Sequence, residues 1–492
     1  MNTRTCLFLA LLFIGTFTGT FTSTFTRAQS LYGGGVGDIP TMVRAADNRF
    51  IAWREHLVDD QAISGIELRG SDGLEMADLD GDGYMDIVSV HESDDVYDGA
   101  PEGHIRIAFG SADPDQWQLV TLAEGPEAGA AEDVAIADVN GDGFPDIIAA
   151  CELAHLIYFQ NPGRDIRNPD WERVMPTNTL DRGSFIRVFL ADLNGDGKPE
   201  AITPNKGAQD PTQARQEPKE ISVFEIPDNA LDANGWTEHV LTRVPWPINS
   251  EPVDLDGDGD LDIVAGTVAQ TRMMWFENKS SNGEFQFEEH AINTRAGTGI
   301  DPQHMLNSAG FNMEYLDVNR DGRLDIITLD TPPLLGRNLV WLEQPASPDG
   351  TWTMHLIGTF GTDSIVGIRV ADIDGDNDMD IMTGGYSLGS RSEDYVADAD
   401  DALGRLAWWE NNGRAEGTFT LHDISRRERG MFDMFTAHDM DADGDMDFVG
   451  TRGNSGAFDG VFWLEQVRSE QQVTRFERAR PSESPEFPAP VE

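Results

Sequence analysis

One acidic segment occurs seven times along this chain and limits the folds open to it. Each copy has the pattern Asp-x-Asp/Asn-x-Asp-x-x-x-Asp/Glu, and an apolar run follows it directly. Successive copies start 60, 54, 62, 63, 55 and 67 residues apart, a period that suits four short strands with their loops. Internal repetition of this kind predicts an all-β fold, a seven-bladed β-propeller over residues 50–466. The seven first aspartates are Asp78, Asp138, Asp192, Asp254, Asp317, Asp372 and Asp439.

The order of the strand motifs predicts how this propeller closes. Outer strands carry an aromatic-x-x-His motif, as in Trp236–His239, and third strands end in Trp-x-Glu-Asn/Gln, as in Trp275–Asn278. The segment Trp53–Val58 is an outer strand that precedes the first acidic loop, and no matching motif follows the last loop. We therefore expect this N-terminal strand to complete the last blade and remove an exposed sheet edge. The segment Val473–Ala479 is the alternative for closing the ring.

The residue types at fixed positions of each acidic loop suit calcium. Side chains at positions 1, 3, 5 and 9 and the backbone carbonyl at position 7 supply only oxygen, the donor that this hard cation prefers. Position 6 needs a positive φ and is glycine in every copy except the sixth, where it is Asn377. The predicted calcium ligands are Asp78, Asp80, Asp82, Tyr84 and Asp86; Asp138, Asn140, Asp142, Phe144 and Asp146; Asp192, Asn194, Asp196, Lys198 and Glu200; Asp254, Asp256, Asp258, Asp260 and Asp262; Asp317, Asn319, Asp321, Arg323 and Asp325; Asp372, Asp374, Asp376, Asp378 and Asp380; and Asp439, Asp441, Asp443, Asp445 and Asp447.

Two other structures share part of this loop pattern. An EF-hand shares the first half of the pattern, but it needs a bidentate glutamate at position 12 and a helix on either side. Position 12 is never acidic here, as Ser89 and Ala149 illustrate, and β-forming residues follow position 9. A single copy could be a plain Asp/Gly-rich hairpin turn, but seven regular copies favour strand–loop–strand calcium sites.

At these loops the chain resembles the FG-GAP-like, or VCBS, repeat family of secreted calcium-binding β-propellers. Members of that family carry Asp-x-Asp-Gly-Asp-Gly-x-x-Asp loops between the first two strands of a blade. The resemblance covers roughly residues 50–466 and implies the propeller fold and bound calcium. It does not imply one activity, since similar propellers serve as lectins, adhesion modules, polysaccharide lyases or sugar dehydratases.

The chain ends and the net charge bear on location and partners. Residues 1–29 combine Arg4, the apolar run Cys6–Ile14 and a small-residue cleavage site at Thr26–Ala28, which is typical of a secretory signal peptide. Residues 30–49 are expected to form a linker and residues 467–492 a largely disordered tail. The net charge of −52 opposes binding to nucleic acid or anionic lipid. We expect a secreted or periplasmic protein with no membrane span, whose partners are calcium and either carbohydrate or another extracellular protein.

A polar ligand site is predicted at the mouth of the central channel, opposite the calcium loops. Residues three and five before each first aspartate should face the channel, and the second strands end at the same mouth. Arg187 and Lys206 are expected to face solvent there. The alternatives are a water-filled channel without a ligand and a site on the connection Asn205–Glu220. The candidate ligand-binding residues are His91, Asp133, Glu152, His155, Arg187, Lys206, Asn249, Asn312 and Arg452.

Two classes of function stay open at this point. The first is a non-catalytic, calcium-stabilised binding or scaffolding module, since the chain has no nucleophile elbow, phosphate loop or paired-histidine zinc motif. The second is a polysaccharide lyase or sugar-modifying enzyme that would use His91, Glu152, Arg187 and Lys206 at the channel mouth. The repeated outer-strand histidines and the buried-type Cys151 are expected to be structural.

Overall fold

The computed structural model describes residues 34–93, 99–153, 155–280, 283–330, 336–387, 397–413, 417–481 and 485–490. Within these ranges the protein is all-β, as predicted. Helix is limited to α1 (Gln61–Ser64), α2 (Pro211–Ala214) and the 3-10 turns η1 (Gly125–Ala128) and η2 (Gly456–Phe458). None of these described helices has the length and apolar character needed to cross a lipid bilayer. The expected signal peptide, residues 1–29, lies outside the described residues.

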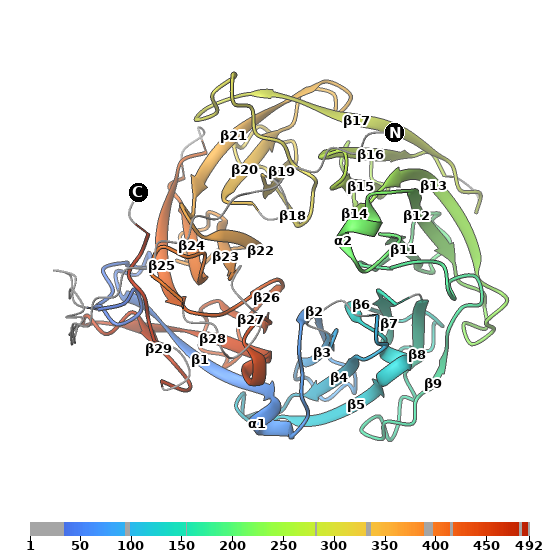
Figure 1. Ribbon diagram of the computed structural model, residues 1–492, viewed down its shortest axis with the longest axis horizontal. Coiled ribbons are helices and arrows are strands. Elements are labelled where there is room, and N and C mark those ends of the chain that lie inside the picture. The colour runs from blue at the N-terminus through green and yellow to red at the C-terminus, as the bar shows by residue number, and fades with distance from the viewer. Residues whose placement is uncertain are drawn as a thin grey trace, which may run out of the picture. The chain divides into compact units, whose positions relative to one another are not determined.

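Small antiparallel sheets, each built from strands that follow one another in sequence, account for most of the described chain (Figure 1). Four of these sheets have four strands. They are β2 (Ser71–Ala77), β3 (Asp86–His91), β4 (His104–Phe109) and β5 (Gln118–Glu124); β6 (Ala131–Ala137), β7 (Asp146–Cys151), β8 (His155–Gln160) and β9 (Glu172–Val174); β10 (Phe189–Ala191), β11 (Glu200–Pro204), β12 (Pro218–Glu225) and β13 (Thr237–Pro245); and β22 (Ser364–Ala371), β23 (Asp380–Tyr386), β24 (Gly404–Asn411) and β25 (Phe419–Arg427).

A larger, eight-stranded sheet consists of two further groups of four strands. Pairing is antiparallel within each group, but the last strands of the two groups, β17 and β21, pair in parallel with Asn293 opposite Thr351. Two four-stranded groups are thus joined at their outer edges. The strands are β14 (Pro247–Val253), β15 (Asp262–Thr267), β16 (Arg272–Asn278) and β17 (Phe287–Ala296), followed by β18 (Met313–Leu316), β19 (Asp325–Leu329), β20 (Asn338–Glu343) and β21 (Thr351–Thr359).

The remaining sheet combines strands from both ends of the described chain. Its order is β26 (Phe435–His438), β27 (Asp447–Arg452), β28 (Gly460–Ser469), β1 (Phe50–Asp60) and β29 (Phe476–Glu477). Figure 1 shows the blue strand β1 beside the red strand β28, and the two pair antiparallel from Phe50↔Ser469 to Asp60↔Gly460. The short strand β29 pairs in parallel with the other edge of β1. The segment around Phe476 therefore adds to β1 rather than replacing it.

The second strand of each four-stranded group is buried on both faces. In β3, Ile87 packs in a cluster with Val449 and Trp463 of the last sheet, while Val88 packs with Ile147 of the following sheet. All five side chains are at most 1% exposed. This two-sided burial explains why an apolar run, rather than an alternating pattern, follows each acidic loop. The core therefore lies between neighbouring sheets.

Both terminal segments are more ordered than the sequence suggested. The expectation of a largely disordered tail over residues 467–492 is wrong for the described part of it. Phe476 of β29 is 4% exposed, and Glu486 accepts hydrogen bonds from Ser425 Oγ and from Arg426 N, the latter at 3.0 Å. In the expected linker, residues 30–49, Val36 N donates to the Phe487 carbonyl at 2.8 Å. Charged and polar residues that cannot build a core by themselves are held here by buried partners on the sheets.

Candidate functional site

The seven acidic loops, called loop 1 to loop 7 in chain order from Asp78, each connect the first and second strands of a four-stranded group. The carboxylate at position 9 anchors every loop. In loop 6, Asp380 accepts from Ile373 N at 3.0 Å through one oxygen and from Asn411 N at 2.8 Å through the other. The bond from the position-2 amide recurs in all seven loops. In loop 6 the buried position-9 carboxylate therefore ties the loop to the third strand.

The side chains at positions 3 and 5 shape the loop by bonding to its own backbone. In every loop the position-3 oxygen accepts from the amide of position 5, and the position-5 oxygen accepts from the amide of position 7. Loop 1 shows both bonds, Asp82 N to Asp80 at 3.2 Å and Tyr84 N to Asp82 at 3.0 Å. Consecutive turns of this kind leave the remaining carboxylate oxygens free to converge.

Two backbone positions of each loop adopt a positive φ. Position 6 was predicted from the sequence and is confirmed, with φ of 92° at Gly83 and 70° at Asn377. Position 4 was not predicted, and it has a positive φ in all seven loops, including 59° at Arg320 and 62° at Ala442. Glycine occupies position 4 in the other five loops, a signal that the sequence contained.

Some of the loops gather carboxylates that could hold a metal ion. In loops 1, 4 and 6, three carboxylates each place one oxygen within 4.8 Å of the other two, as Asp78, Asp80 and Asp86 do in loop 1. Burial raises the pKa of Asp86 to about 7 and that of Asp380 to about 8, and neighbouring loop carboxylates add to the rise. Closely spaced carboxylates that lose solvation are the kind of donor group that a cation can bind.

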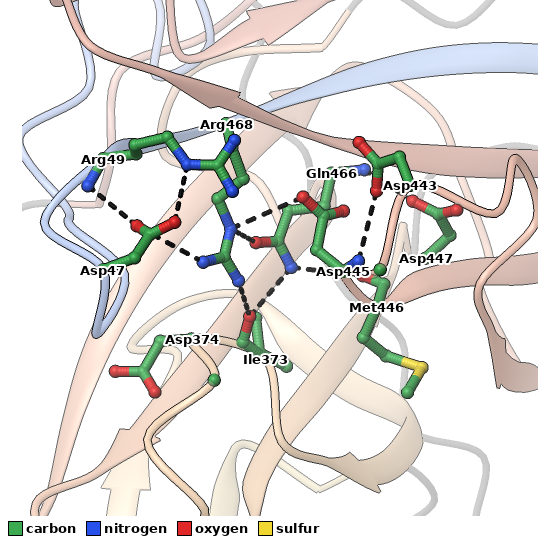
Figure 2. Close-up of polar contacts among 12 residues, drawn as sticks. Asp47, Arg49, Ile373, Asp374, Asp443, Asp445, Met446, Asp447, Gln466 and Arg468 are labelled. Carbon is green, nitrogen blue, oxygen red and sulfur yellow. Dashed lines mark hydrogen bonds and ion pairs between the residues drawn. The ribbon is translucent and has the colours of Figure 1, made fainter.

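Basic side chains from a neighbouring group of strands touch several loops. Arg167 lies 2.7 Å from Asp80 of loop 1, and Arg320 of loop 5 pairs with Asp378 of loop 6. Figure 2 shows Arg468 of β28 between loop 7 and loop 6, where it donates to the Ile373 carbonyl at 3.0 Å and lies 3.6 Å from Asp445. These contacts link adjacent loops, and the sequence pattern of the loops alone did not predict them.

An amide at the end of the third strand makes a second link between loops. Gln466 donates to the carbonyl of Ile373 at position 2 of loop 6 at 2.8 Å and to that of Met446 in its own loop at 3.1 Å (Figure 2). Asn161, Asn278 and Gln344 make the same bond to the preceding loop. In these four motifs the final Asn or Gln thus links consecutive repeats, whereas Asn411 bonds to the Met379 carbonyl of its own loop.

The predicted channel-facing residues are buried and bonded across the first strands of neighbouring groups. Asp133 accepts from Val188 N at 3.0 Å, and Asn312 donates to the Val366 carbonyl at 2.7 Å. Arg187 lies 3.2 Å from Asp433, a residue that the sequence analysis did not single out, and 3.4 Å from Asn312. Arg187 is 1% exposed, so the prediction that it faces solvent is wrong. The first strands lie close enough for their polar side chains to bond directly.

A second buried group forms around Lys206, which was also wrongly predicted to face solvent. Lys206 is 6% exposed and pairs with Glu152, which is 2% exposed. Burial raises the pKa of the nearby Glu132 well above its usual range, and the charges of Glu152 and Glu92 raise it further. Lys206 acts in the opposite direction. The structure therefore brings Glu152 and Lys206 together, as predicted, but below the surface.

The other candidate ligand residues serve local contacts. His91 is fully buried beside Ser71 Oγ at 2.7 Å, and His155 lies 2.8 Å from the Glu127 carbonyl. Asn249 donates to the Phe311 carbonyl at 2.9 Å, and Arg452 Nη1 lies 3.7 Å from Glu55. Asn249 therefore lies beside the Arg187 group, because the Phe311 ring is 5.4 Å from the Arg187 guanidinium.

The outer-strand histidines pack as the sequence suggested. His56, His290 and His355 stack on Trp463, Trp275 and Trp341, with ring centroids 4.0–4.6 Å apart. Each of these histidines also lies beside a glutamate of the Trp-x-Glu motif. Cys151 is fully buried, and burial raises the pKa of its thiol. A structural role accounts for all of them.

Comparison with known proteins agrees with the loop geometry. The family model of the FG-GAP-like repeat matches residues 78–149, 254–328 and 317–383, and each match begins at the first aspartate of an acidic loop. The chain carries FG-GAP-like repeats. This confirms the resemblance seen in the sequence and, with the small sheets, a β-propeller-like all-β fold.

Two further comparisons add little beyond the family. The crystal structure of a protein from Lactobacillus plantarum, a structural genomics target, shares 12% sequence identity with this chain at a TM-score of 0.41. That similarity covers 71% of this chain and 83% of the other. The chain has no significant match among curated protein sequences.

Proposed function

We propose that this protein is an extracellular, calcium-stabilised seven-bladed β-propeller that serves as a non-catalytic binding or scaffolding module for carbohydrate or another protein. The observation that carries the calcium proposal is the backbone bonding pattern that recurs in all seven acidic loops. In loops 1, 4 and 6 carboxylate oxygens gather within 4.8 Å of one another, and a bound cation would offset their repulsion. Bound calcium would use positions 1, 3, 5 and 9 and the position-7 carbonyl of each loop.

The contacts between four-stranded groups support seven blades in a closed ring. Polar side chains of one first strand bond to the backbone of the next group, as Glu75 does to Ile136 N at 2.6 Å and Arg369 does to the Phe435 carbonyl at 2.9 Å. Thr451 of the last group donates to the Asp72 carbonyl of the first at 3.0 Å. Together with the pairing of β1 and β28, this contact supports closure between the two ends of the repeat array.

The buried state of the candidate catalytic groups favours binding over catalysis. His91, the candidate base, is fully buried, and burial lowers its pKa well below the usual range. Arg187 and Lys206 are held in ion pairs with Asp433 and Glu152. A substrate carboxylate would have to displace a buried ion pair to reach either cation, which is costly. A lyase or sugar-modifying activity therefore has less support than binding.

Metal analysis combined with thermal unfolding tests the calcium proposal. Calcium binds only the folded protein, so a hundredfold excess over the dissociation constant stabilises each independent site by about 2.7 kcal/mol. We expect several equivalents of calcium in the purified protein and a large fall in Tm after chelation, reversed by calcium but not by magnesium. A metal-free protein whose Tm does not respond to chelator or calcium would overturn the proposal. N-terminal sequencing of protein from the culture medium tests export, with the mature chain expected to begin at Ser30.

A further inference from the structure

A histidine and three carboxylates meet at the strands β16 and β17 and the turn that precedes β21. One ligand atom each of Glu277, Glu288 and His290 lies within 4.8 Å of the other two. Glu277 is on β16 and the other two residues are on β17, so the antiparallel pairing of these strands fixes all three backbones. Asp349, on the turn, lies 2.6 Å from His290 Nδ1. Unlike the acidic loops, this cluster therefore includes a nitrogen ligand.

The imidazole of His290 is held with one nitrogen facing the glutamates. Its ring stacks on Trp275, which is the structural contact that the other outer-strand histidines also make. A carboxylate only accepts hydrogen bonds, so in the neutral ring the proton is at Nδ1, facing Asp349. The lone pair of Nε2 then faces Glu277 Oε2 at 3.2 Å. A carboxylate behind a histidine is the arrangement that orients histidine ligands in metal sites.

The cluster is accessible, and the carboxylate behind the histidine is fixed. The side chains of the histidine and of its partner glutamate on β16 are 16% and 18% exposed, and Glu288 is exposed. The turn that carries Asp349 is held by Trp352, whose indole N–H donates to the Pro348 carbonyl at 2.9 Å. An ion from solvent can therefore reach ligand atoms that are already in place.

The residue opposite the glutamate of the Trp-x-Glu motif differs between repeats. In the last sheet Arg54 lies opposite Glu465 and pairs with it at 2.8 Å, and in three other groups the opposite residue is threonine. Here Glu288 lies opposite Glu277, and like charges in directly opposed positions destabilise a sheet. Lys279 pairs with Oε1 of Glu277, so Oε2 remains for a metal. A cation between the two glutamates would offset their repulsion, as Arg54 offsets the charge of its partner.

The donor set selects the class of metal. One imidazole nitrogen and two carboxylate oxygens suit zinc and related divalent transition metals, whereas calcium and magnesium prefer oxygen alone. Three protein ligands leave one position for water in a four-coordinate site. The next repeat has a different tautomer, because His355 Nδ1 accepts from Thr298 N at 2.9 Å. Its proton is then at Nε2, facing Glu343, and that nitrogen has no lone pair for a metal.

We propose that Glu277, Glu288 and His290 bind one divalent transition metal ion of the zinc class, with Asp349 as the positioning residue for the imidazole. None of these residues belongs to an acidic loop, so the inference does not depend on the proposed calcium sites or on a ligand of the propeller. The bound ion would join β16 to β17 and, through Asp349, support the outer edge where β17 and β21 pair in parallel (Figure 1).

Calorimetric titration of the full chain with zinc chloride, in saturating calcium so that the acidic loops are occupied, tests the site. We expect one equivalent of zinc to bind and to raise Tm. Glu288→Thr introduces the residue found at this position in three other groups. It should remove that equivalent and the zinc response of Tm, while its Tm without zinc equals or exceeds that of the wild type. The matched control is Glu289→Thr, which removes the same charge one residue away and should leave zinc binding unchanged.

The positioning role has its own test. Asp349→Ala should weaken zinc binding by about 10–100-fold, the usual effect of removing the partner of a histidine ligand. Asp349→Asn, whose amide oxygen still accepts from Nδ1, should weaken zinc binding less. Neither substitution should change Tm in the absence of zinc.

Four results would overturn the inference. They are a wild-type chain that binds no zinc, full zinc binding by Glu288→Thr, equal loss of binding in Glu289→Thr, and a Glu288→Thr variant that is less stable without zinc. Equal loss in the control would show only a general attraction to acidic surface, and lower stability would show that Glu288 serves the fold. None of these results bears on the calcium response of Tm, which tests the proposed function separately.

Discussion

Carboxylates that look equivalent in the sequence have different roles within one loop. In loop 6, Asp380 is fully buried and accepts backbone hydrogen bonds with both oxygens, from Asn411 N and from the amides of Ile373 and Asp374. Asp376, at position 5, is exposed and accepts one bond, from Asp378 N. The loop pattern predicted both as ligands, but the spacing of acidic residues carries no information on burial. The structural role of position 9 could therefore not be predicted.

Substitution of Asp380 and of Asp376 should distinguish a carboxylate needed for folding from one needed only for metal binding. Asp380→Asn replaces an accepting oxygen with an amide donor that faces backbone N–H groups. Above pH 8, where the Asp380 carboxyl is ionised even without metal, it should lower the unfolding free energy by roughly 1–3 kcal/mol with or without calcium. Asp376→Asn keeps its one accepting oxygen, so it should lower stability only when calcium is present. Urea unfolding in calcium and in excess chelator measures both. Equal stability of the two variants in chelator would contradict the division of roles.

At the level of elements, the sequence predicts the conformation of each acidic loop, but it does not predict the contacts between loops. The positive φ at Gly83 and Asn377, the strand–loop–strand context and the family were all predictable, because each depends on residues within one repeat. The hydrogen bond from Gln466 to Ile373 joins residues 93 positions apart, and Arg468 joins the same two loops. Such contacts depend on how neighbouring sheets pack. The spacing of motifs along the chain gives no information on this packing.

The position-9 carboxylates predict an unusual dependence of stability on pH. Burial raises the pKa of Asp86 to about 7 and those of Asp380 and Asp447 to about 8, from an ordinary value of 3.8. The folded state therefore binds these protons more tightly than the unfolded state. Without metal, the stability that these carboxyls contribute is fully present below their ordinary pKa and is lost progressively as pH rises from about 4 to about 8. Unfolding in chelator from pH 5 to pH 8 should show this fall. Calcium should flatten it, and equal slopes with and without calcium would contradict the prediction.

For the whole molecule, the sequence repeats predicted the fold better than the amino-acid composition predicted the order and burial of individual segments. The all-β fold and the partner of β1 were predictable because seven similar repeats must bury both faces of their sheets. The structure of the C-terminal segment and the burial of the channel-facing residues were not predictable. A polar composition suggested a disordered tail around Glu486 and solvent-facing cations at Arg187 and Lys206. In the structure these groups find buried partners on elements distant in sequence, Arg426 and Asp433 among them. Composition describes a segment in isolation and cannot anticipate such partners.

Closure of the ring can be tested by joining its two ends covalently. Ala52 of β1 and Val467 of β28 are antiparallel partners, and directly opposed residues lie within the range of Cα separations that a disulfide spans. In Ala52→Cys/Val467→Cys a disulfide should form under mild oxidation, since Cys151 is buried and does not compete. It would close a very long loop and should raise stability by about 2–4 kcal/mol, an effect that reductant abolishes. The control pair Ala52→Cys/Leu464→Cys, whose positions are not opposed, should stay reduced. Faster migration on a non-reducing gel and a reductant-sensitive Tm measure the outcome, and if the first pair also stayed reduced, β1 would not complete the last sheet in solution.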